Sequence, residues 1–382
     1  MKKILISIFI IFAFLIYFFN EQKYYNNNIV LGASLPKTGI MKDWGHNVEI
    51  GTNAYFKYVN EKGILPNNKK ISLISLDDKY EPNLTIENTN KLLERKDLFA
   101  FYGYVGTPTV KKILPIIENN SIPFIAPFTG ASFLRDKNKQ NIVNFRASYY
   151  EEIDKIIEYL NTKKKIKKFA VFYQNDDYGE EGFVSTIKSL RSRDLALNGE
   201  GMYKRNTLSI KHAFSEIRDS KPEAIIMVGA YQANALFIKK AKMDPVLKDS
   251  IFCIISFGDA SAIVKELNYE TQNIIFSQVV PSFDNYRIEI IREYKYMMRR
   301  YYPKESLGFI SLEAFLVAKS VVESIKNIKG PLSKNAFLKE WNRLPKEILR
   351  GIKLEHKKDQ LSNKVYLFKY EESTFKEINK DD

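Results

Sequence analysis

The hydrophobic positions of this 382-residue chain follow two alternating periods. Short apolar runs rich in β-branched residues, which predict buried strands, lie at 29–35, 71–76, 99–105, 122–126, 169–173, 224–228, 251–256 and 274–280. Between most of these runs, apolar residues recur at i, i+3 and i+4, which predicts amphipathic helices at 50–60, 86–93, 110–117, 153–160, 182–190 and 233–241. Continuous apolar strands alternating with such helices indicate parallel sheets covered on both faces. We therefore predict an α/β fold of the doubly wound kind.

The length suits two domains of ordinary size. A hydrophobic content of 45%, with 26 Phe and 23 Tyr, is ample for packed cores. The net charge of +14 admits nucleic acid, an anionic membrane surface or acidic ligands as partners. However, the basic residues are scattered, and the densest run, 163–168, directly precedes a predicted strand. Because no groove-reading motif accompanies the charge, we do not expect a nucleic-acid partner.

The N-terminus predicts export. Met1-Lys2-Lys3 and the apolar run 4–19 have the charged start and hydrophobic core of a secretory signal. The following residues, 18–25, contain no small-x-small cleavage site. Residues 1–22 are therefore expected to be either a cleaved signal peptide or an inner-membrane anchor that Lys2 and Lys3 orient. Either alternative predicts a periplasmic location for the rest of the chain.

Residues typical of catalysis or metal binding form no motif. The histidines His46, His212 and His356 are far apart, and the single cysteine, Cys253, lies in an apolar run that predicts a buried thiol. No zinc-binding H-E-x-x-H, no G-x-S-x-G nucleophile elbow and no glycine-rich phosphate loop occurs. We expect no metal, no cofactor and no enzymatic activity; a hydrolase or transferase on an α/β scaffold is the weakest alternative.

Three neighbouring segments point to a family: Ile122-Pro-Phe-Ile-Ala-Pro-Phe-Thr-Gly-Ala131, Asn144-Phe-Arg-Ala-Ser-Tyr-Tyr-Glu-Glu152 and Phe169-Ala-Val-Phe-Tyr-Gln-Asn-Asp-Asp-Tyr-Gly179. Together they resemble the middle of type I periplasmic solute-binding proteins of the leucine/isoleucine/valine-binding class. The resemblance implies two doubly wound parallel-sheet lobes joined by a multi-strand hinge. Lobe 1 would comprise 29–146 plus 278–345, and lobe 2 would comprise 147–277 plus 346–382.

The same resemblance implies a function. Proteins of this class bind a small ligand between the lobes, which close by a hinge motion. We expect an amino acid, an amide or a carboxylate as the ligand, an ABC permease in the inner membrane as the partner, and a monomer. The alternative is a ligand-sensing periplasmic module that reports to a membrane sensor kinase or a chemoreceptor.

Ligands of open parallel sheets bind beyond the carboxyl ends of the strands. Thr107 followed by Pro108 is typical of a helix start, with a hydroxyl N-cap and then proline. Free amides and the helix dipole there favour a ligand carboxylate, although capping alone also explains the pair. Thr129 and Gly130 would bring a hydroxyl and a closely approaching backbone to the ligand. Phe128 would either narrow the pocket or turn into the core.

The assignment of the remaining site residues depends mainly on the resemblance. Trp44 would lie over the ligand side chain, with packing at the hinge as the alternative. Tyr178 and Tyr231, each just past a predicted strand, would close over the ligand from lobe 2. Ser148 and Tyr149 are lesser pocket candidates. Phe257 would line the rim of the pocket, although sheet-end packing explains it about as well.

Three charged residues have two interpretations each. Arg146 would either neutralise an acidic ligand or hold the interlobe crossover by pairing with a carboxylate, and we favour the second role. Asp176 and Asp177 would either pair with a ligand amine or serve a turn or helix cap, and again we favour the structural role.

Overall fold

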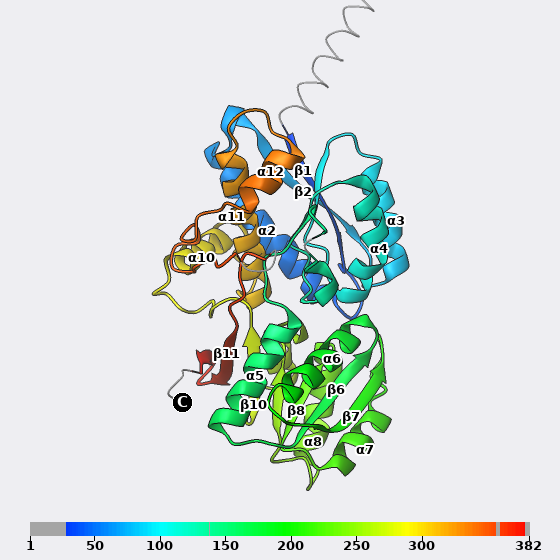
Figure 1. Cartoon of the computed structure of the whole chain (residues 1–382). Coiled ribbons are helices and arrows are strands. Elements are labelled where there is room, and N and C mark those ends of the chain that lie inside the picture. The colour runs from blue at the N-terminus through cyan, green and yellow to red at the C-terminus, as the bar shows by residue number, and fades with distance from the viewer. Residues whose placement is uncertain (1–27, 137, 357–359, 379–382) are drawn as a thin grey trace, which may run out of the picture.

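Two sheets, one in each of two stacked lobes, form the frame of the molecule (Figure 1). The structure is a computed structural model and describes residues 28–136, 138–356 and 360–378. The predicted signal or anchor segment, 1–22, lies outside these residues. Among the described residues, no helix is both long and apolar enough to cross a membrane.

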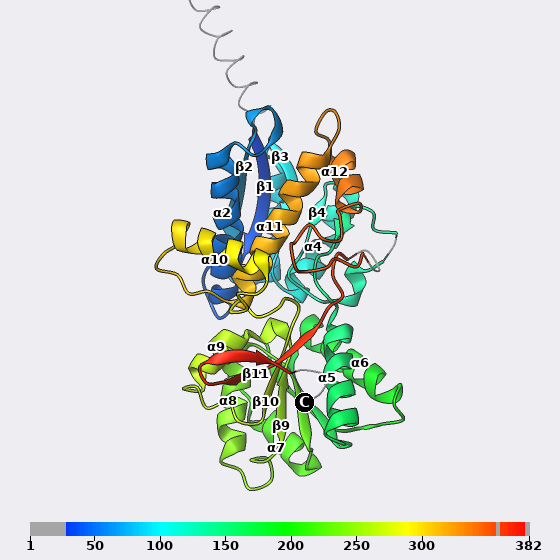
Figure 2. The same cartoon turned by 90° about the vertical axis from the view of Figure 1, so that its left-hand side faces the viewer.

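The first sheet is wholly parallel, with strand order β2-β1-β3-β4-β5. Its strands are β1 (Asn28–Leu35), β2 (Lys70–Asp77), β3 (Leu98–Tyr102), β4 (Phe124–Ile125) and β5 (Ile142–Val143). The helices of this lobe are α2 (Lys42–Lys62), α3 (Pro82–Leu93), α4 (Thr107–Asn120), α10 (Glu289–Tyr301), α11 (Phe309–Asn327) and α12 (Lys334–Trp341). Figure 2 shows α11 lying against this lobe, far in sequence from the strands that it covers.

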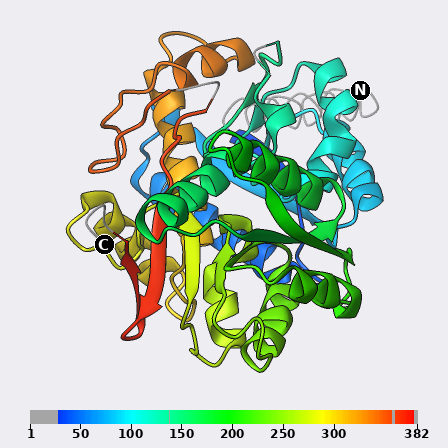
Figure 3. The same ribbon diagram turned by 60° about the horizontal axis from the view of Figure 1, so that its bottom comes forward.

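The second sheet has the order β12-β11-β10-β9-β8-β6-β7. Its strands are β6 (Phe169–Asn175), β7 (Leu197–Lys204), β8 (Ala224–Val228), β9 (Ile251–Ile254), β10 (Ile274–Gln278), β11 (Tyr366–Glu371) and β12 (Thr374–Glu377). The helices of this lobe are α5 (Tyr149–Lys163), α6 (Asp177–Arg191), α7 (Lys211–Ser220), α8 (Tyr231–Lys242) and α9 (Ala260–Glu266). Strands β6 to β10 pair in parallel, whereas β11 and β12 add an antiparallel edge (Figure 3).

Burial explains which strands the hydrophobic pattern could predict. All five residues of β8, Ala-Ile-Ile-Met-Val, are buried because helices cover both faces of the sheet. The edge strand β7 has the sequence Leu-Asn-Gly-Glu-Gly-Met-Tyr-Lys, and its residues alternate between exposed and less exposed positions. It contains no apolar run, so the sequence did not predict it. The predicted parallel α/β architecture is confirmed, with the antiparallel edge as an addition.

The chain crosses between the lobes after β5, after β10 and before β11. The exact lobe boundaries stay a prediction. Leu361 and Ser362, which we expected in lobe 2, donate hydrogen bonds to the carbonyls of Asn144 (3.1 Å) and Phe145 (2.9 Å), directly after β5.

Candidate ligand site between the lobes

Three hydroxyl groups meet at the end of the first lobe that faces the second. Thr107 follows β3, Thr129 follows β4, and Tyr149 begins α5. The Oγ1 atoms of Thr107 and Thr129 are 2.7 Å apart, and the Tyr149 hydroxyl lies 3.2 Å from Thr129 and 3.4 Å from Thr107. These three residues are fully buried. Three of the residues predicted from the sequence therefore form one polar cluster.

Helix α4 begins one residue earlier than expected. Gly106, with a φ of 101°, is its N-cap, and Thr107 is the first helical residue. The Thr107 hydroxyl bonds Thr129 instead of capping the helix, and no side chain caps the helix start. The first-turn amides and the helix dipole are thus available to an anionic group.

Gly130 is required by packing. A Cβ atom at this position would lie 2.6 Å from the Cδ1 atom and 2.6 Å from the backbone nitrogen of Tyr149. The Tyr149 amide donates to the Gly130 carbonyl at 2.9 Å. Ser148 caps α5 through a capping box with Glu151, so its hydroxyl serves the helix start.

Phe257 is the centre of an aromatic cluster that joins the lobes. It belongs to the short 3₁₀ helix Ser256–Gly258 of the second lobe. Its ring stacks on Trp44 of the first lobe at 4.8 Å between centroids and contacts Tyr178 at 4.8 Å. The rings of Tyr80 and Tyr149 lie 6.4 Å and 6.5 Å away. The Trp44 Nε1–H group also donates to the Phe257 carbonyl at 3.1 Å.

The aromatic residues expected at the site are deeply buried. Trp44, Tyr178 and Phe257 are each 1% exposed, and Phe128, which is fully buried, packs edge-on against Trp44 at 6.0 Å. Tyr80 was missed by the sequence analysis. Tyr80 follows the carboxyl end of β2, just as Tyr178 and Tyr231 each follow a strand. It was not named as a candidate because it is outside the three segments that resemble the family.

Tyr231 lies apart from this cluster. It is the first residue of α8 and lines a cavity of about 400 Å³ together with Asp43 of the first lobe and Asp259 of the second. Burial, and then the neighbouring Asp43, raise the pKa of Tyr231 to about 12. The sequence grouped Tyr231 with Tyr178, but only Tyr178 contacts the rings around Phe257.

Arg146 is part of a buried ionic network at the hinge. Its Nε atom is 3.2 Å from a carboxylate oxygen of Glu313 on α11, and its Nη2 atom donates to the Ser256 hydroxyl. Burial raises the pKa of Glu313 to about 7, whereas Arg146 lowers it. The carboxylate of Glu152 accepts bonds from the amide (2.7 Å) and the hydroxyl (2.8 Å) of Ser256. Arg146 thus has the structural pairing that we favoured.

Asp176 is the N-cap of α6, as favoured, and accepts from the amides of Tyr178 (3.0 Å) and Gly179 (3.2 Å). Asp177 instead forms an ion pair across the lobes with Lys111 of α4 at 2.5 Å.

Further polar contacts join the two lobes around the aromatic cluster. Arg205, in the loop after β7, donates to the Tyr80 carbonyl and pairs with Glu81 at 3.2 Å. The guanidinium of Arg205 also lies over the Tyr80 ring, 4.7 Å from its centroid. Ser132 donates to Glu181 through its amide (3.0 Å) and its hydroxyl (2.9 Å). The structure is therefore that of a closed pair of lobes.

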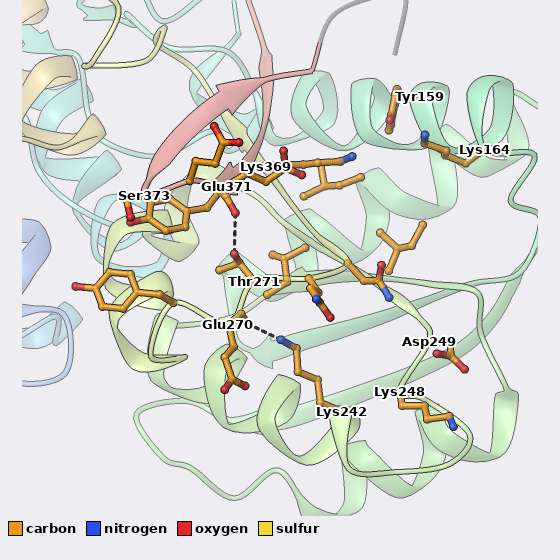
Figure 4. A pocket seen from close by; sticks show the side chains of 18 residues that line it. Tyr159, Lys164, Lys242, Lys248, Asp249, Glu270, Thr271, Lys369, Glu371 and Ser373 are labelled. Carbon is orange, nitrogen blue, oxygen red and sulfur yellow. Dashed lines mark hydrogen bonds between the residues drawn. The ribbon is translucent and has the colours of Figure 1, made fainter.

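A larger cavity, of about 1280 Å³, lies at the far end of the second lobe (Figure 4). It is beside the amino ends of β9 and β10, opposite the end where α/β sheets bind ligands. Four lysines and four carboxylates line it: Lys164, Lys242, Lys248, Lys369, Asp249, Glu270, Glu371 and Glu372. With its charges balanced, the cavity has no clear preference for an anion or a cation.

The described part of the chain contains no group of three or more His, Cys, Asp and Glu side chains that could hold a metal ion. Cys253 is fully buried, and its burial raises the pKa of the thiol. This agrees with the predicted inert thiol.

A two-lobed α/β protein with polar and aromatic groups between the lobes has the architecture of a type I solute-binding protein. A family model described as "Periplasmic binding protein" matches residues 28–375, and the chain belongs to this family. Proteins of this family are extracytoplasmic solute-binding proteins. The resemblance seen in the sequence is thus confirmed.

Solved structures support the same assignment. A possible leucine/isoleucine/valine-binding protein from Rhodopirellula baltica is 32% identical, with 93% of this chain and 97% of that chain covered and a TM-score of 0.87. A branched-chain amino acid ABC transporter protein from Thermus thermophilus, solved with bound valine, is 16% identical, with 92% and 95% covered and a TM-score of 0.81. At 16% identity, the similarity to the Thermus structure shows only that the fold is shared.

Two characterised relatives match over shorter segments. An amino acid binding protein of Pseudomonas aeruginosa is 23% identical over 155 residues, which are 40% of this chain and 41% of that protein. A receptor-type adenylate cyclase B of Leishmania donovani is 28% identical over 171 residues, which are 43% of this chain and 13% of that protein. The matched segments thus span less than half the length of these relatives.

Proposed function

We propose that this protein is the extracytoplasmic receptor of an ABC importer and binds a small, amino-acid-like ligand between its lobes. One observation carries the proposal: the Thr107, Thr129 and Tyr149 hydroxyls lie together where the two lobes meet, and the rings of Tyr178 and Phe257 of the second lobe pack against Tyr149. Hydroxyls beside the start of α4 suit a carboxylate, and the rings suit an apolar side chain.

In this proposal the first lobe binds the ligand first. Thr107, Thr129 and the amides of α4 hold its carboxylate, while Trp44 and Phe128 contact its apolar part. The second lobe then closes by a hinge motion and brings Tyr178 and Phe257 over the ligand. The residues assigned to ligand binding are Trp44, Thr107, Phe128, Thr129, Gly130, Tyr149, Tyr178 and Phe257. Ser148 and Tyr231, also expected from the sequence, are not assigned to it, because the Ser148 hydroxyl caps α5 and Tyr231 lines the cavity beside Asp43 and Asp259. The closed monomer is presented to the permease, and no covalent chemistry is involved.

The relatives support this assignment. The Rhodopirellula protein, 32% identical over nearly the whole chain, is described as a possible leucine/isoleucine/valine-binding protein. The Thermus structure, which shares the fold, contains valine. A fatty acid ABC transporter substrate-binding protein from Thermomonospora curvata also has this fold, so the fold accepts carboxylates without an amine.

A thermal-shift screen of the purified full-length protein tests the proposal, with amino acids, short amides, aromatic acids and dicarboxylates as ligands. A ligand at one hundred times its Kd stabilises a protein by about 2.7 kcal/mol, which raises the melting temperature by a few degrees. Thr129→Ala should abolish the shift. Thr162→Ala, which removes an exposed hydroxyl from α5, should not. A well-folded protein that responds to no compound in the panel would refute the proposal.

Sensing is the second candidate function, and the similarity to the Leishmania receptor-type adenylate cyclase favours it. In that role the closed lobes signal to a membrane kinase or chemoreceptor instead of delivering ligand. Uptake of the identified ligand by cells lacking this protein separates the two functions. Lost uptake supports the importer, whereas normal uptake with a lost cellular response supports the sensor.

A further inference from the structure

Three buried polar groups around Phe257 have no hydrogen-bond partner among the described residues. They are the hydroxyls of Tyr80 and Tyr178 and the Nη1 atom of Arg146. Each of these side chains is 1% exposed. The two tyrosine rings contact Phe257 directly, and the Arg146 guanidinium lies over Trp44, which stacks on Phe257. A buried donor without an acceptor is destabilising, so three at one place indicate acceptors supplied by a bound molecule.

The chemistry of these groups indicates what kind of molecule would bind there. A guanidinium can only donate hydrogen bonds, and tyrosine hydroxyls donate readily to a carboxylate. The start of α4 beside them favours an anion as well. A carboxylate offers about four acceptor positions and so can serve several of these donors at once.

A ligand ammonium group, by contrast, would find the nearby carboxylates already in use. Glu152 accepts from the amide and hydroxyl of Ser256 at 2.7 and 2.8 Å and from the Ser277 hydroxyl at 2.6 Å. It is fully buried. An incoming ammonium would have to displace one of these donors from a fully buried carboxylate.

Asp176 is saturated in the same way. Beyond the two amides that it caps, it accepts from Gln174 at 2.6 Å and pairs with Arg205 at 3.3 Å. Glu313 is paired with Arg146 at 3.2 Å. The positive charges of Arg146 and Arg205 near the same rings further disfavour a cationic group.

We propose that the interlobe site is selective for apolar carboxylic acids that lack an ammonium group, such as 2-oxo and 2-hydroxy acids, over the corresponding α-amino acids. The carboxylate faces the Arg146 guanidinium, the Tyr80 and Tyr178 hydroxyls and the start of α4. The apolar body lies among Trp44, Phe128 and Phe257. This inference rests on the proposed function, because it narrows the ligand class of the same site.

Isothermal titration calorimetry with matched ligand pairs tests the inference. The full-length protein is titrated with phenylpyruvate and L-phenylalanine, and with 4-methyl-2-oxopentanoate and L-leucine. We expect at least one oxo acid to bind ten times more tightly than its amino acid. An amino acid that binds as tightly as its oxo acid, or more tightly, overturns this inference but leaves the receptor function standing. If no compound of this series or of the wider panel binds, the receptor function itself fails.

Substitutions locate the binding groups. Tyr178→Phe and Tyr80→Phe each remove one hydroxyl that has no protein partner, so the melting temperature without ligand should stay the same or rise. Oxo-acid affinity should fall about tenfold for each. Tyr159→Phe is the matched control, because Tyr159 also has a buried hydroxyl without a partner but lines the distant cavity in Figure 4. Unchanged oxo-acid affinity in both Tyr178→Phe and Tyr80→Phe overturns the assignment.

Discussion

The indole nitrogen of Trp44 donates a hydrogen bond to the carbonyl of Phe257 at 3.1 Å, across 213 positions of sequence and from one lobe to the other. The same two residues stack at 4.8 Å with their planes 28° apart. One residue pair thus joins the lobes through both a polar contact and an aromatic contact. Both contacts lie at the junction of the two lobes.

Trp44→Phe should weaken the closed state. The substitution removes the interlobe hydrogen bond and part of the stacked area, whose combined contribution is about 1–2 kcal/mol. We expect ligand affinity to fall about tenfold, measured by calorimetry. Trp341→Phe is the control, since Trp341 is the other tryptophan and packs against Phe337 on α12.

The same pair of variants gives an optical test. Trp44 is the only tryptophan left in Trp341→Phe, so this variant should keep a ligand-induced change in tryptophan fluorescence. Trp44→Phe should lose most of it. A fluorescence change that persists in Trp44→Phe and disappears in Trp341→Phe would contradict the location of the site.

Arg205→Ala should favour an open arrangement of the lobes. Arg205 binds Tyr80 and Glu81 of the first lobe while it pairs with Asp176 of its own lobe. Because Glu81 is partly exposed, the expected loss is modest, about 1 kcal/mol. Ligand dissociation should become several times faster, and small-angle X-ray scattering should show a larger radius of gyration.

Arg218→Ala is the control for Arg205→Ala, since Arg218 pairs with Asp244 within the second lobe at 2.8 Å. It should leave both dissociation and scattering unchanged. An equal effect of the two variants would mean that Arg205 acts through general charge instead of through contact between the lobes.

The buried Glu313 should make stability depend on pH. Its pKa is raised from an ordinary value of 4.5 to about 7 in the folded protein, chiefly by burial. Between these pH values the unfolded chain loses the proton that the folded protein keeps, so the free energy of unfolding falls as pH rises. The stabilisation that comes from keeping Glu313 protonated in the folded protein is fully present below pH 4.5 and is lost above pH 7.

Glu313→Gln removes the titration but keeps the shape of the side chain. Its melting temperature should therefore fall less between about pH 5 and pH 8 than that of the unmodified protein, measured by calorimetry. Glu118→Gln, which neutralises a largely exposed carboxylate on α4, should retain the original pH profile. An unchanged profile in Glu313→Gln would show that this carboxylate does not carry the effect.

Gly106→Ala should disrupt the site locally. Gly106 has a φ of +101°, and a Cβ atom there would lie 2.2 Å from the Cε2 atom of the Tyr80 ring. Backbone strain and displacement of Tyr80 together should lower the free energy of unfolding by roughly 2–4 kcal/mol, measured by urea titration. Ligand affinity should fall as well.

Gly63→Ala isolates the backbone effect. Gly63 has a φ of +60° and no atom within 4 Å of an added Cβ. Its substitution should lower the free energy of unfolding by only about 1 kcal/mol and leave ligand affinity intact. Equal losses in the two variants would show that contact with Tyr80 has no part in the effect.

The sequence by itself determined the fold class, most strands and the residues that follow them. The runs at 224–228 and 169–173 correspond to β8 and to most of β6, because strands buried on both faces need continuous apolar sequence. Strands β5, β7, β11 and β12 were not predicted. β5, β7 and β12 are edge strands and β11 is next to one, and an open face or edge removes the need for a continuous apolar run. The interlobe candidates were named largely through the family resemblance.

Only the tertiary structure decided how these candidates are arranged. Thr107, Thr129 and Tyr149 share hydrogen bonds, and Tyr178 contacts Tyr149, whereas Tyr231 lines a cavity with Asp43 and Asp259. Tyr80 and Arg205, 125 positions apart, are brought together by the closure of the lobes. Periodicity reports the burial of each residue along its own element. It carries no information on which loops of two separate sheets come to face each other, because long-range packing determines that arrangement.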